Sequence, residues 1–240
     1  MESGADVVTL PDIARVAAAI GSRARASILE RLLDARSAPA GTLADVAGVA
    51  RSTASAHLEM LIDAGLLSVE RQGRQRRYRL ASPDVAHAIE ALATIAPRRP
   101  VTSLRDATSA ERLRTARTCY DHLAGRLGVA LSEALVATGA LRLRDEAYLV
   151  TRKGEVVFSA LGIDLTAARL RRRAFAIPCL DWTERRMHLA GALGAALCDR
   201  FMTLGWIERS GPGREVALTT AGTAMIRTRL GVNPPMPGVS

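Results

Sequence analysis

The chain has 240 residues, a formal net charge of +9 and an isoelectric point near 10.7, which together favour a polyanionic partner. Aromatic residues make up only 3% of the sequence, which excludes a stacking platform for single-stranded nucleic acid. No apolar run approaches membrane-spanning length, no signal peptide opens the chain, and three scattered cysteines are too few for a disulfide scaffold. We therefore expect a cytoplasmic protein of two domains.

A helix-turn-helix is the first structure that the sequence predicts. Thr42 can cap a short helix through Ala47, and Gly48 supplies the sharp turn that must follow. A second helix then opens at Ser52 or Thr53, and apolar residues at helical spacing give it one buried face: Ala54, Leu58, Leu61 and Ile62. Its leading end keeps side chains that can reach base edges and phosphates: Arg51, Ser52, Thr53, Ser55 and His57.

A basic β-hairpin follows the second helix. Strands are expected at 66–70 and 76–80, and Gly73 permits the tight reversal between them. Residues 1–97 hold 11 basic and 11 acidic side chains, so attraction to DNA must come from local clustering of arginines. The arginines that we expect to contact DNA are Arg71, Arg74, Arg76 and Arg77. Few architectures need all these parts in this order, and one that does is a winged helix-turn-helix, which places its second helix in the major groove.

The segment 11–96 resembles the ArsR-type family of winged-helix repressors. The resemblance is carried by AIGSRARASIL at 19–29, STASAHL at 52–58, AGL at 64–66, and the run from GR to YRL at 73–80. It implies a homodimer built from the first and last helices of the domain, a two-fold DNA operator, and release when an inducer arrives. A dimer also follows physically, because two recognition helices spaced by one DNA turn read a palindrome.

The metal sites of the family's metal-sensing members are not matched. Those members often carry a Cys-rich segment in the first motif helix, where this chain has Leu43-Ala44-Asp45-Val46. In the helix after the wing, Asp84, His87 and Glu90 stand at i, i+3 and i+6, unlike the two-carboxylate, two-histidine pattern of the zinc-sensing members. We therefore expect neither usual metal site, and the sequence requires no cofactor.

The second half of the chain contains an internal duplication. The stretch HLAGRLGVAL at 122–131 matches HLAGALGAAL at 188–197, an offset of 66, and shorter matches follow. Each unit reads helix, short hairpin, helix, without a polar recognition helix. The predicted fold class is mainly α with small β-hairpin wings: a winged helix-turn-helix followed by a duplicated, degenerate winged-helix-like C-terminal domain.

The expected domain boundaries follow from the duplication and from the Pro- and Arg-rich stretch at 96–100. They are a DNA-binding and dimerisation domain at 1–97, a linker at 98–116, a C-terminal domain at 117–232 made of units at about 117–165 and 179–232, and a tail at 233–240.

Two cysteines and two histidines stand at corresponding places in the two repeats: Cys119, His122, Cys179 and His188. They could converge on a pseudo-two-fold axis as a metal site. Nearby arginines would lower the pKa of a thiol, so a thiol switch is a second hypothesis, and an anionic small-molecule pocket is a third. A fourth interpretation is that the cysteines are core residues and the histidines cap or cross-link helices.

The leading functional hypothesis is an effector-responsive repressor of transcription that binds operator DNA and has no membrane partner. A cysteine-dependent enzyme is a second class, but no general base, phosphate loop or cofactor fingerprint accompanies the cysteines, so we predict no enzymatic activity. A non-specific DNA-coating protein is a third class, and it predicts a steep salt dependence with little preference for one operator.

Overall fold

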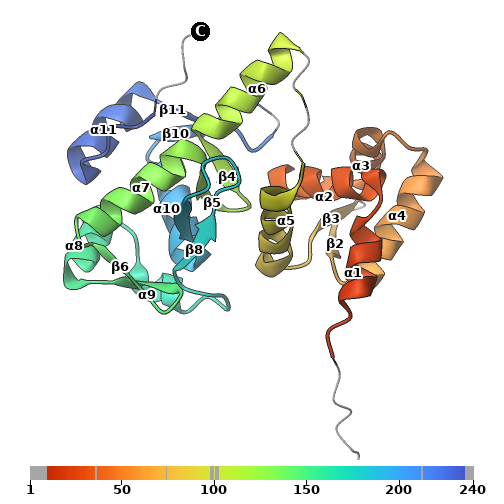
Figure 1. Ribbon diagram of the computed structural model, residues 1–240, viewed down its shortest axis with the longest axis horizontal. Helices are drawn as coiled ribbons and strands as arrows, with labels where there is room; N and C mark the ends of the chain where they lie inside the picture. The colour runs from red at the N-terminus through yellow and green to blue at the C-terminus, as the bar shows by residue number, and fades with distance from the viewer. Residues whose placement is uncertain are drawn as a thin grey trace, which may run out of the picture. The chain divides into compact units, whose positions relative to one another are not determined.

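The computed structural model describes residues 10–35, 37–73, 75–97, 100, 103–211 and 213–235. The chain divides into two compact units, Met1–Leu32 with Ser37–Ser82 and Leu33–Arg36 with Pro83–Ser240 (Figure 1). Helices predominate in both units, and the strands pair in small antiparallel sheets, so the predicted fold class is confirmed. Among the described helices, none has the length and hydrophobicity needed to cross a lipid bilayer.

The first unit is a helix-turn-helix with a three-stranded wing in the order β1-β3-β2. Its elements are α1 (Ile13–Ile20), most of α2 (Arg23–Ala35), β1 (Ala38–Pro39), α3 (Ala40–Ala47), α4 (Arg51–Asp63), β2 (Leu67–Gln72) and β3 (Gln75–Leu80). Apolar faces of these elements meet in a core that includes Leu43, Ala54, Leu58, Leu61 and Leu80. The apolar spacing in the sequence therefore placed the correct face of α4 inward.

The turn between α3 and α4 depends on Gly48. Its backbone is left-handed, with φ of 66°, and its N–H bonds the carbonyl groups that end α3, as the sequence predicted. The predicted cap at Thr42 is wrong, because α3 begins two residues earlier. Pro39 is the N-cap there, since its ring fixes φ near the helical value while its extended ψ of 156° ends β1.

The second unit contains α5 (Pro83–Ile95), α6 (Leu104–Thr115) and the two repeats. The first repeat comprises β4 (Arg117–Cys119), β5 (His122–Ala124), α7 (Gly125–Ala137), β6 (Leu141–Arg144), β7 (Ala147–Val150) and α8 (Arg152–Ala160). After α9 (Leu165–Arg169), the second repeat comprises β8 (Ile177–Leu180), β9 (Met187–Ala190), α10 (Gly191–Thr203), β10 (Ile207–Arg209), β11 (Val216–Leu218) and α11 (Thr220–Leu230). Each repeat thus has a hairpin before its first helix that the sequence analysis missed.

Three predicted boundaries need correction. The first domain does not extend to residue 97, because α5 buries Glu90 in the second unit, where its carboxylate pairs with Arg214. The predicted linker 98–116 contains α6, which packs against α7, although residues 98, 99, 101 and 102 lie outside the described part of the chain. The second repeat starts before residue 179, since β8 begins at 177. Pro234 is buried, whereas positions 236–240 of the predicted tail lie outside the described residues.

The two repeats share their local stereochemistry. Thr151 caps α8 by accepting the N–H of Gly154, and Thr219 caps α11 by accepting the N–H of Gly222. A Cβ atom at Gly154 would lie 2.1 Å from the carbonyl oxygen of Ala140, and one at Gly222 would collide in the same way with the backbone of the second repeat. Both repeats carry Thr-x-x-Gly, at 151–154 and at 219–222, and in each copy this sequence marks a threonine cap and a close backbone approach.

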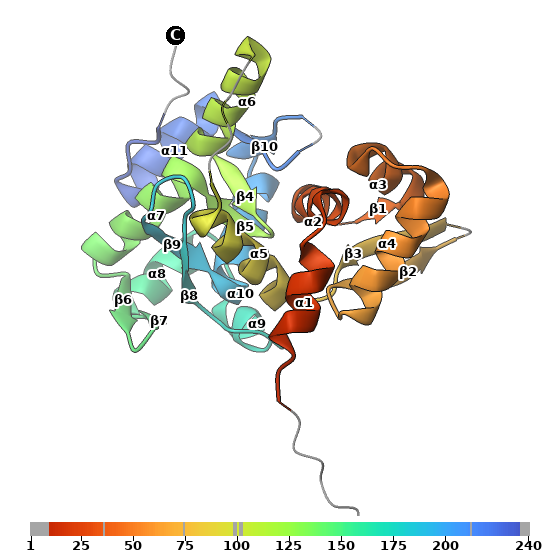
Figure 2. The ribbon, with the colours of Figure 1, turned by 45° about the vertical axis from the view of Figure 1, so that its right-hand side comes forward.

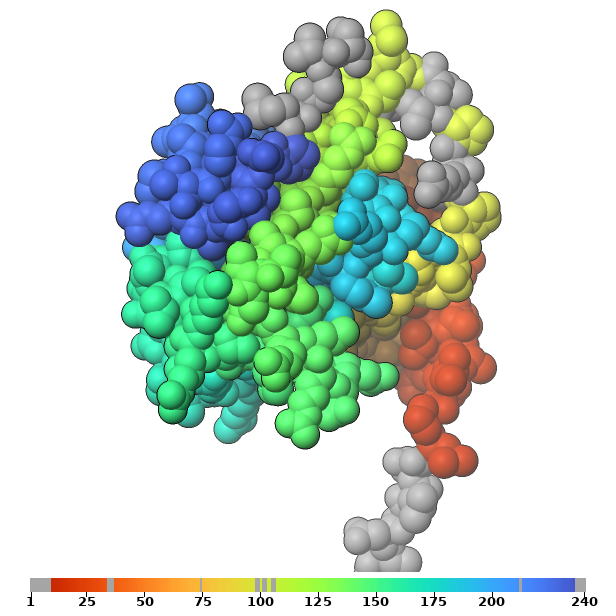
Figure 3. Space-filling view, turned by 60° about the vertical axis from the view of Figure 1, so that its left-hand side comes forward, coloured from red at the N-terminus to blue at the C-terminus, as the bar shows by residue number. Residues whose placement is uncertain are grey.

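The repeats pack reciprocally around one core. Helix α7 of the first repeat packs against β9 of the second, and α10 of the second packs against β5 of the first. The hairpins β4–β5 and β8–β9 lie side by side, and β8–β9 also lies beside α7 on the surface (Figures 2 and 3). Phe158, Phe201 and Trp206 fill the shared core. This exchange places equivalent residues of the two hairpins opposite one another.

Candidate nucleic-acid interface and cysteine-histidine cluster

The first turns of α4 form an exposed polar face. Arg51, Ser52, Thr53 and Ser55 are all solvent-exposed, whereas Ala54 is buried beneath them. No side chain caps the helix, since its N-cap is Ala50, so the N–H groups of the first turn remain available to an anion. The Ser55 hydroxyl donates to the carbonyl of Arg51 at 3.1 Å and keeps its acceptor lone pairs. This face can read base edges and bind phosphate.

His57 is held by a residue that the sequence analysis did not single out. Arg25 is nearly buried, donates to the carbonyl groups of Ala18 and Ala19, and places its Nη1 3.3 Å from His57 Nδ1. Because a guanidinium can only donate, Nδ1 accepts and the imidazole proton lies on Nε2. Arg25 therefore fixes the position and tautomer of His57 on α4.

The wing carries a pair of like charges directly opposite each other. Arg71 of β2 faces Arg76 of β3 in the ladder, and both side chains are exposed. Like charges at directly opposite positions destabilise a hairpin, and opposed residues project from the same face. Such a pair is relieved by a polyanion, which makes the wing tip a suitable phosphate contact.

The other wing arginines have protein partners. Arg77 donates from Nε to the hydroxyl of Ser37 at 3.0 Å and from Nη2 to its carbonyl at 2.9 Å. Arg79 pairs with Glu70 at 2.7 Å and is exposed. Arg77 therefore fastens β3 to the chain before β1, and its predicted DNA contact is not supported by this geometry. Arg74 lies outside the described residues.

The four predicted cysteine and histidine residues of the second unit come together. Cys119 is directly opposite His122 in the β4–β5 hairpin, and Cys179 is directly opposite His188 in β8–β9. The two sulfur atoms are 3.9 Å apart and the two Nε2 atoms are 3.2 Å apart. One potential ligand atom from each residue lies within 4.8 Å of the other three, and all but Cys179 are buried. This convergence is the arrangement that the duplication suggested.

Each histidine has a carboxylate beside its second ring nitrogen. His122 Nδ1 lies 3.5 Å from Oδ1 of Asp121, which is paired with Arg173. His188 Nδ1 lies 3.5 Å from Oδ2 of Asp181, which is paired with Arg117 at 2.9 Å. Arg117 belongs to β4 of the first repeat and Asp181 follows β8 of the second, whereas Arg173 lies in the segment between α9 and β8. The Arg117–Asp181 pair therefore links the two repeats, and the Asp121–Arg173 pair links the first repeat to the segment that precedes the second.

Asp181 is the most heavily bonded carboxylate near the cluster. It accepts hydrogen bonds from the backbone N–H of Gly125 at 2.7 Å, from that of Glu184 at 3.0 Å, and from the hydroxyl of Thr183 at 2.6 Å. Burial opposes its ionisation, but Arg117 and these hydrogen bonds outweigh burial and hold its pKa well below the ordinary value. Asp181 is therefore a permanent negative charge beside His188.

The protonation of the cluster follows from its contacts. The hydrogen bond with Cys179, together with burial, raises the pKa of the Cys119 thiol well above its ordinary value. Burial, and then the charge of His122, lower the pKa of His188 well below its ordinary value. Burial also disfavours protonation of His122, but Cys119 and Asp121 outweigh it and raise that pKa to about 9. The 3.2 Å contact between the Nε2 atoms requires one histidine to donate its proton and the other to accept it.

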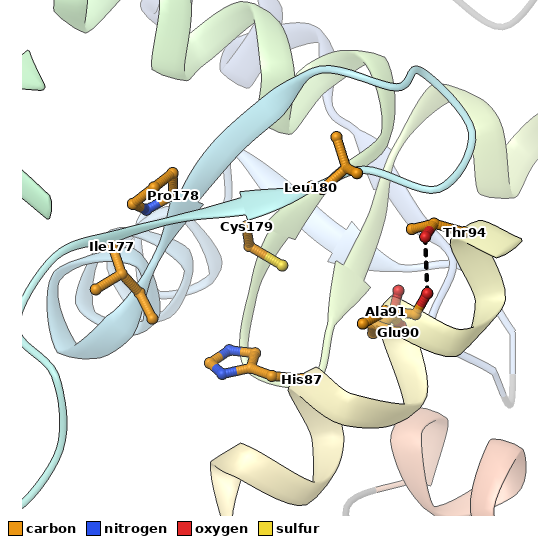
Figure 4. A pocket seen from close by; sticks show the side chains of 8 residues that line it. All are labelled: His87, Glu90, Ala91, Thr94, Ile177, Pro178, Cys179 and Leu180. Carbon is orange, nitrogen blue, oxygen red and sulfur yellow. Dashed lines mark hydrogen bonds between the residues drawn. The ribbon is translucent and has the colours of Figure 1, made fainter. Parts of the chain in front are cut away.

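A pocket of about 290 Å³ opens beside the cluster, between α5 and β8. In Figure 4, the His87 ring and the Cys179 side chain point toward the same space, and Thr94 is bonded to the carbonyl of Ala91 at the far side. The Nε2 atom of His87 is buried without a hydrogen-bond partner among the described residues. His87 and Glu90 were considered only for the usual family metal site, so their place at this pocket was missed.

The fold of the first unit is that of a winged helix-turn-helix protein, and the comparison with known proteins agrees with it. A family model described as "Helix-turn-helix domain" matches residues 20–70. The HTH-type transcriptional regulator YdfF of Bacillus subtilis is 45% identical over 222 residues, which cover 92% of this chain and 98% of YdfF. The HTH-type transcriptional regulator CmtR of Mycobacterium tuberculosis is 39% identical over 83 residues, 35% of this chain and 70% of CmtR.

The chain belongs to the helix-turn-helix (HTH-type) transcriptional regulators. The similarity to YdfF spans both units, whereas the similarity to CmtR covers about a third of the chain. Among solved structures, the homodimeric winged helix-turn-helix DNA-binding domain of a Mycobacterium bovis protein is 28% identical, covers 38% of this chain and 87% of that domain, and has a TM-score of 0.33.

Proposed function

We propose that the chain is a homodimeric repressor that binds a two-fold operator through α4 and the wing, and that its second unit receives an effector. The observation that carries the proposal is the exposed Arg71–Arg76 pair on the same unit as the uncapped, polar leading end of α4. The pair supplies phosphate contacts, and Arg51, Ser52, Thr53 and Ser55 supply base contacts. The protein would act on DNA in the cytoplasm.

Exposed apolar side chains support the dimer. Ile13 on α1 is 76% exposed, and Ile95 on α5 is 77% exposed. Exposure alone does not mark an interface, since Leu104 on α6 is 89% exposed. Ile13 and Ile95 are singled out because they lie on the first and last helices of the segment that resembles the family. Replacement of Ile95 by Glu should give a monomer by light scattering, whereas Leu104→Glu on α6, at a still more exposed site, should leave the dimer intact.

The DNA-binding proposal is tested by selecting duplexes from a random pool with the full-length protein. We expect an enriched palindrome whose half-sites are about one helical turn apart. Ser52→Ala or Ser55→Ala should weaken binding to the selected site more than to random DNA, by about 1–3 kcal/mol for a base contact. If no sequence is enriched and the affinity for DNA falls steeply with salt concentration, the protein is instead a non-specific DNA-coating protein.

The wing is tested with a matched pair of charge variants. Arg76→Gln should weaken binding to selected and random DNA alike and reduce the salt slope by about one. Arg79→Gln removes the same charge from the same hairpin, but that arginine already pairs with Glu70. It should therefore change the slope less. Equal losses in the two variants would show that only the net charge of the wing matters.

A further inference from the structure

We propose that Cys119, His122, Cys179 and His188 form a tetrahedral site for a thiophilic divalent cation of the zinc class, which joins the two repeats of the second unit. None of these residues lies on the first unit, so the proposal does not depend on the DNA-binding function. The ligands would be the two Sγ atoms and the two Nε2 atoms. Each hairpin contributes one sulfur and one nitrogen from directly opposed positions.

The spacing of the four side chains fits tetrahedral coordination. With zinc–nitrogen bonds of about 2.05 Å and zinc–sulfur bonds of about 2.3 Å, the edges of the tetrahedron are about 3.3 Å between nitrogens and about 3.8 Å between sulfurs. The Nε2 atoms are 3.2 Å apart and the Sγ atoms are 3.9 Å apart. Since all four ligand atoms lie within 4.8 Å of one another, small side-chain rotations complete the site. Oxygen-preferring cations such as Mg²⁺ are disfavoured by this donor set.

The charge balance also favours a divalent cation. Two thiolates neutralise a dication, so the bound site buries no net charge. The nearest charges outside it already cancel, because Asp121 pairs with Arg173 and Asp181 pairs with Arg117. As the metal binds, the two thiol protons and the Nε2 proton shared by the histidines leave to solvent, and four metal–ligand bonds form.

The histidines are oriented as metal ligands usually are. A metal-binding imidazole commonly directs its second nitrogen to a carboxylate, which fixes the ring and raises its basicity. His122 and His188 both place Nδ1 3.5 Å from an aspartate oxygen, and both direct Nε2 to the centre of the cluster. Within the described part of the chain, His188 Nδ1 is buried without a hydrogen-bond partner, so a small shortening of its distance to Asp181 would satisfy it. The same arrangement occurs in both repeats.

The pocket between α5 and β8 offers the metal a route to the site. Cys179 is the half-buried ligand and lines that pocket, whereas the other three ligands are buried. His87 lies across the pocket, and its Nε2 has no hydrogen-bond partner in the residues that the structure describes. Its ring centroid is 5.9 Å from that of His122, close enough for His87 to hold an arriving cation before the four ligands do. We therefore expect His87→Ala to slow metal exchange while leaving the stoichiometry unchanged.

The experiment is metal analysis of the intact, reduced protein, followed by titration of the metal-free protein with Co²⁺. We expect one zinc-class ion per chain and the visible absorption of tetrahedral, thiolate-bound Co²⁺. Cys179→Ser should weaken the sulfur-to-metal band, because only Cys119 then supplies a thiolate. It should also weaken metal binding by more than the roughly 10–100-fold loss that is typical when an outer partner of a ligand is removed. Asp121→Asn should weaken metal binding by no more than that roughly 10–100-fold.

A control variant separates the site from general thiol chemistry. Cys198 lies in α10 outside the cluster, so Cys198→Ser should keep the metal and the spectrum. The proposal would be overturned by the absence of bound Co²⁺ in a reduced, folded protein, or by an equal loss in the Cys198 and Cys179 variants. A Cys119–Cys179 disulfide that persists under reducing conditions would also overturn it, in favour of a redox pair. DNA affinity is measured in a separate experiment, and its outcome does not bear on whether the metal site exists.

Discussion

Hairpins in the two units use directly opposed residues in contrasting ways. The wing hairpin β2–β3 exposes two arginines that repel each other, Arg71 and Arg76. The hairpins β4–β5 and β8–β9 bury or half-bury a cysteine opposite a histidine. In both cases, directly opposed residues present side chains that can bind an ion. The arginine pair of the wing suits an anion, and the cysteine–histidine pairs of the second unit suit a cation. The difference arises from burial and from neighbouring charges.

The contrast extends to the ion pairs beside each hairpin. On the wing, Arg79 and Glu70 form an exposed pair at 2.7 Å. Beside the cluster, Arg117 and Asp181 form a pair at 2.9 Å with no exposed side-chain surface. Solvent screens the exposed Arg79–Glu70 pair but not the buried Arg117–Asp181 pair. Loss of the arginine should therefore change the free energy of unfolding far more at the buried pair.

The largest expected effect is at the buried pair. Arg117→Met leaves Asp181 as an uncompensated buried charge, so the free energy of unfolding should fall by about 3–5 kcal/mol. Denaturant unfolding followed by tryptophan fluorescence measures this, because Trp182 and Trp206 both lie in the second unit. Adding Asp181→Asn should recover part of the loss. Arg79→Met on the wing is the matched control, followed by circular dichroism because both tryptophans lie in the second unit, with an expected change of about 0–1 kcal/mol.

Metal removal should have the next largest effect. At a free metal concentration 1,000 times the dissociation constant, binding to the folded state alone stabilises it by about 4 kcal/mol. A chelator added to the reduced protein should therefore lower the unfolding temperature of the second unit, measured by the same fluorescence, and added Zn²⁺ should restore it. If neither the chelator nor Zn²⁺ changes the unfolding temperature, the proposal that a metal joins the two repeats is contradicted.

The glycines that let α7 and α10 approach the hairpin of their own repeat should give smaller, similar losses. A Cβ atom at Gly128 would lie 2.3 Å from the carbonyl oxygen of Leu123, and one at Gly194 would lie 2.5 Å from that of Leu189. Gly128→Ala and Gly194→Ala should each cost about 1–3 kcal/mol of stability by overpacking. Gly41→Ala in α3 meets nothing within 4 Å and should be neutral or slightly stabilising by circular dichroism. A loss in only one repeat would mean that the duplicates have diverged in packing.

The sequence predicted the parts that local patterns encode. Periodic apolar residues located α4, Gly48 located its turn, and the 66-residue offset paired His122 with His188. It did not predict the hairpins that hold the cluster, because β4 and β5 have only three residues each and no alternating pattern.

The supporting charges were harder to predict, because they depend on contacts between distant segments. Arg117 bonds a carboxylate 64 residues away, and Arg173 bonds one 52 residues away. Arg25 reaches His57 across 32 residues. Nothing in local spacing distinguishes these arginines from the solvated arginines that surround them in the sequence. The cluster itself could be anticipated only because duplication placed its members at related positions.

The smallest effect on stability should accompany a clear effect on DNA binding. Arg71→Gln removes the repulsion with Arg76, so the hairpin should be unchanged or more stable by about 0.2–1 kcal/mol. The same change removes a phosphate contact, so the slope of log affinity against log salt should fall by about one. Chemical denaturation and binding at several salt concentrations give the two numbers for one variant. A variant that is more stable but binds DNA more weakly would mean that the arginine pair serves anion binding at the expense of stability. A variant that loses both stability and DNA affinity would make Arg71 a structural residue.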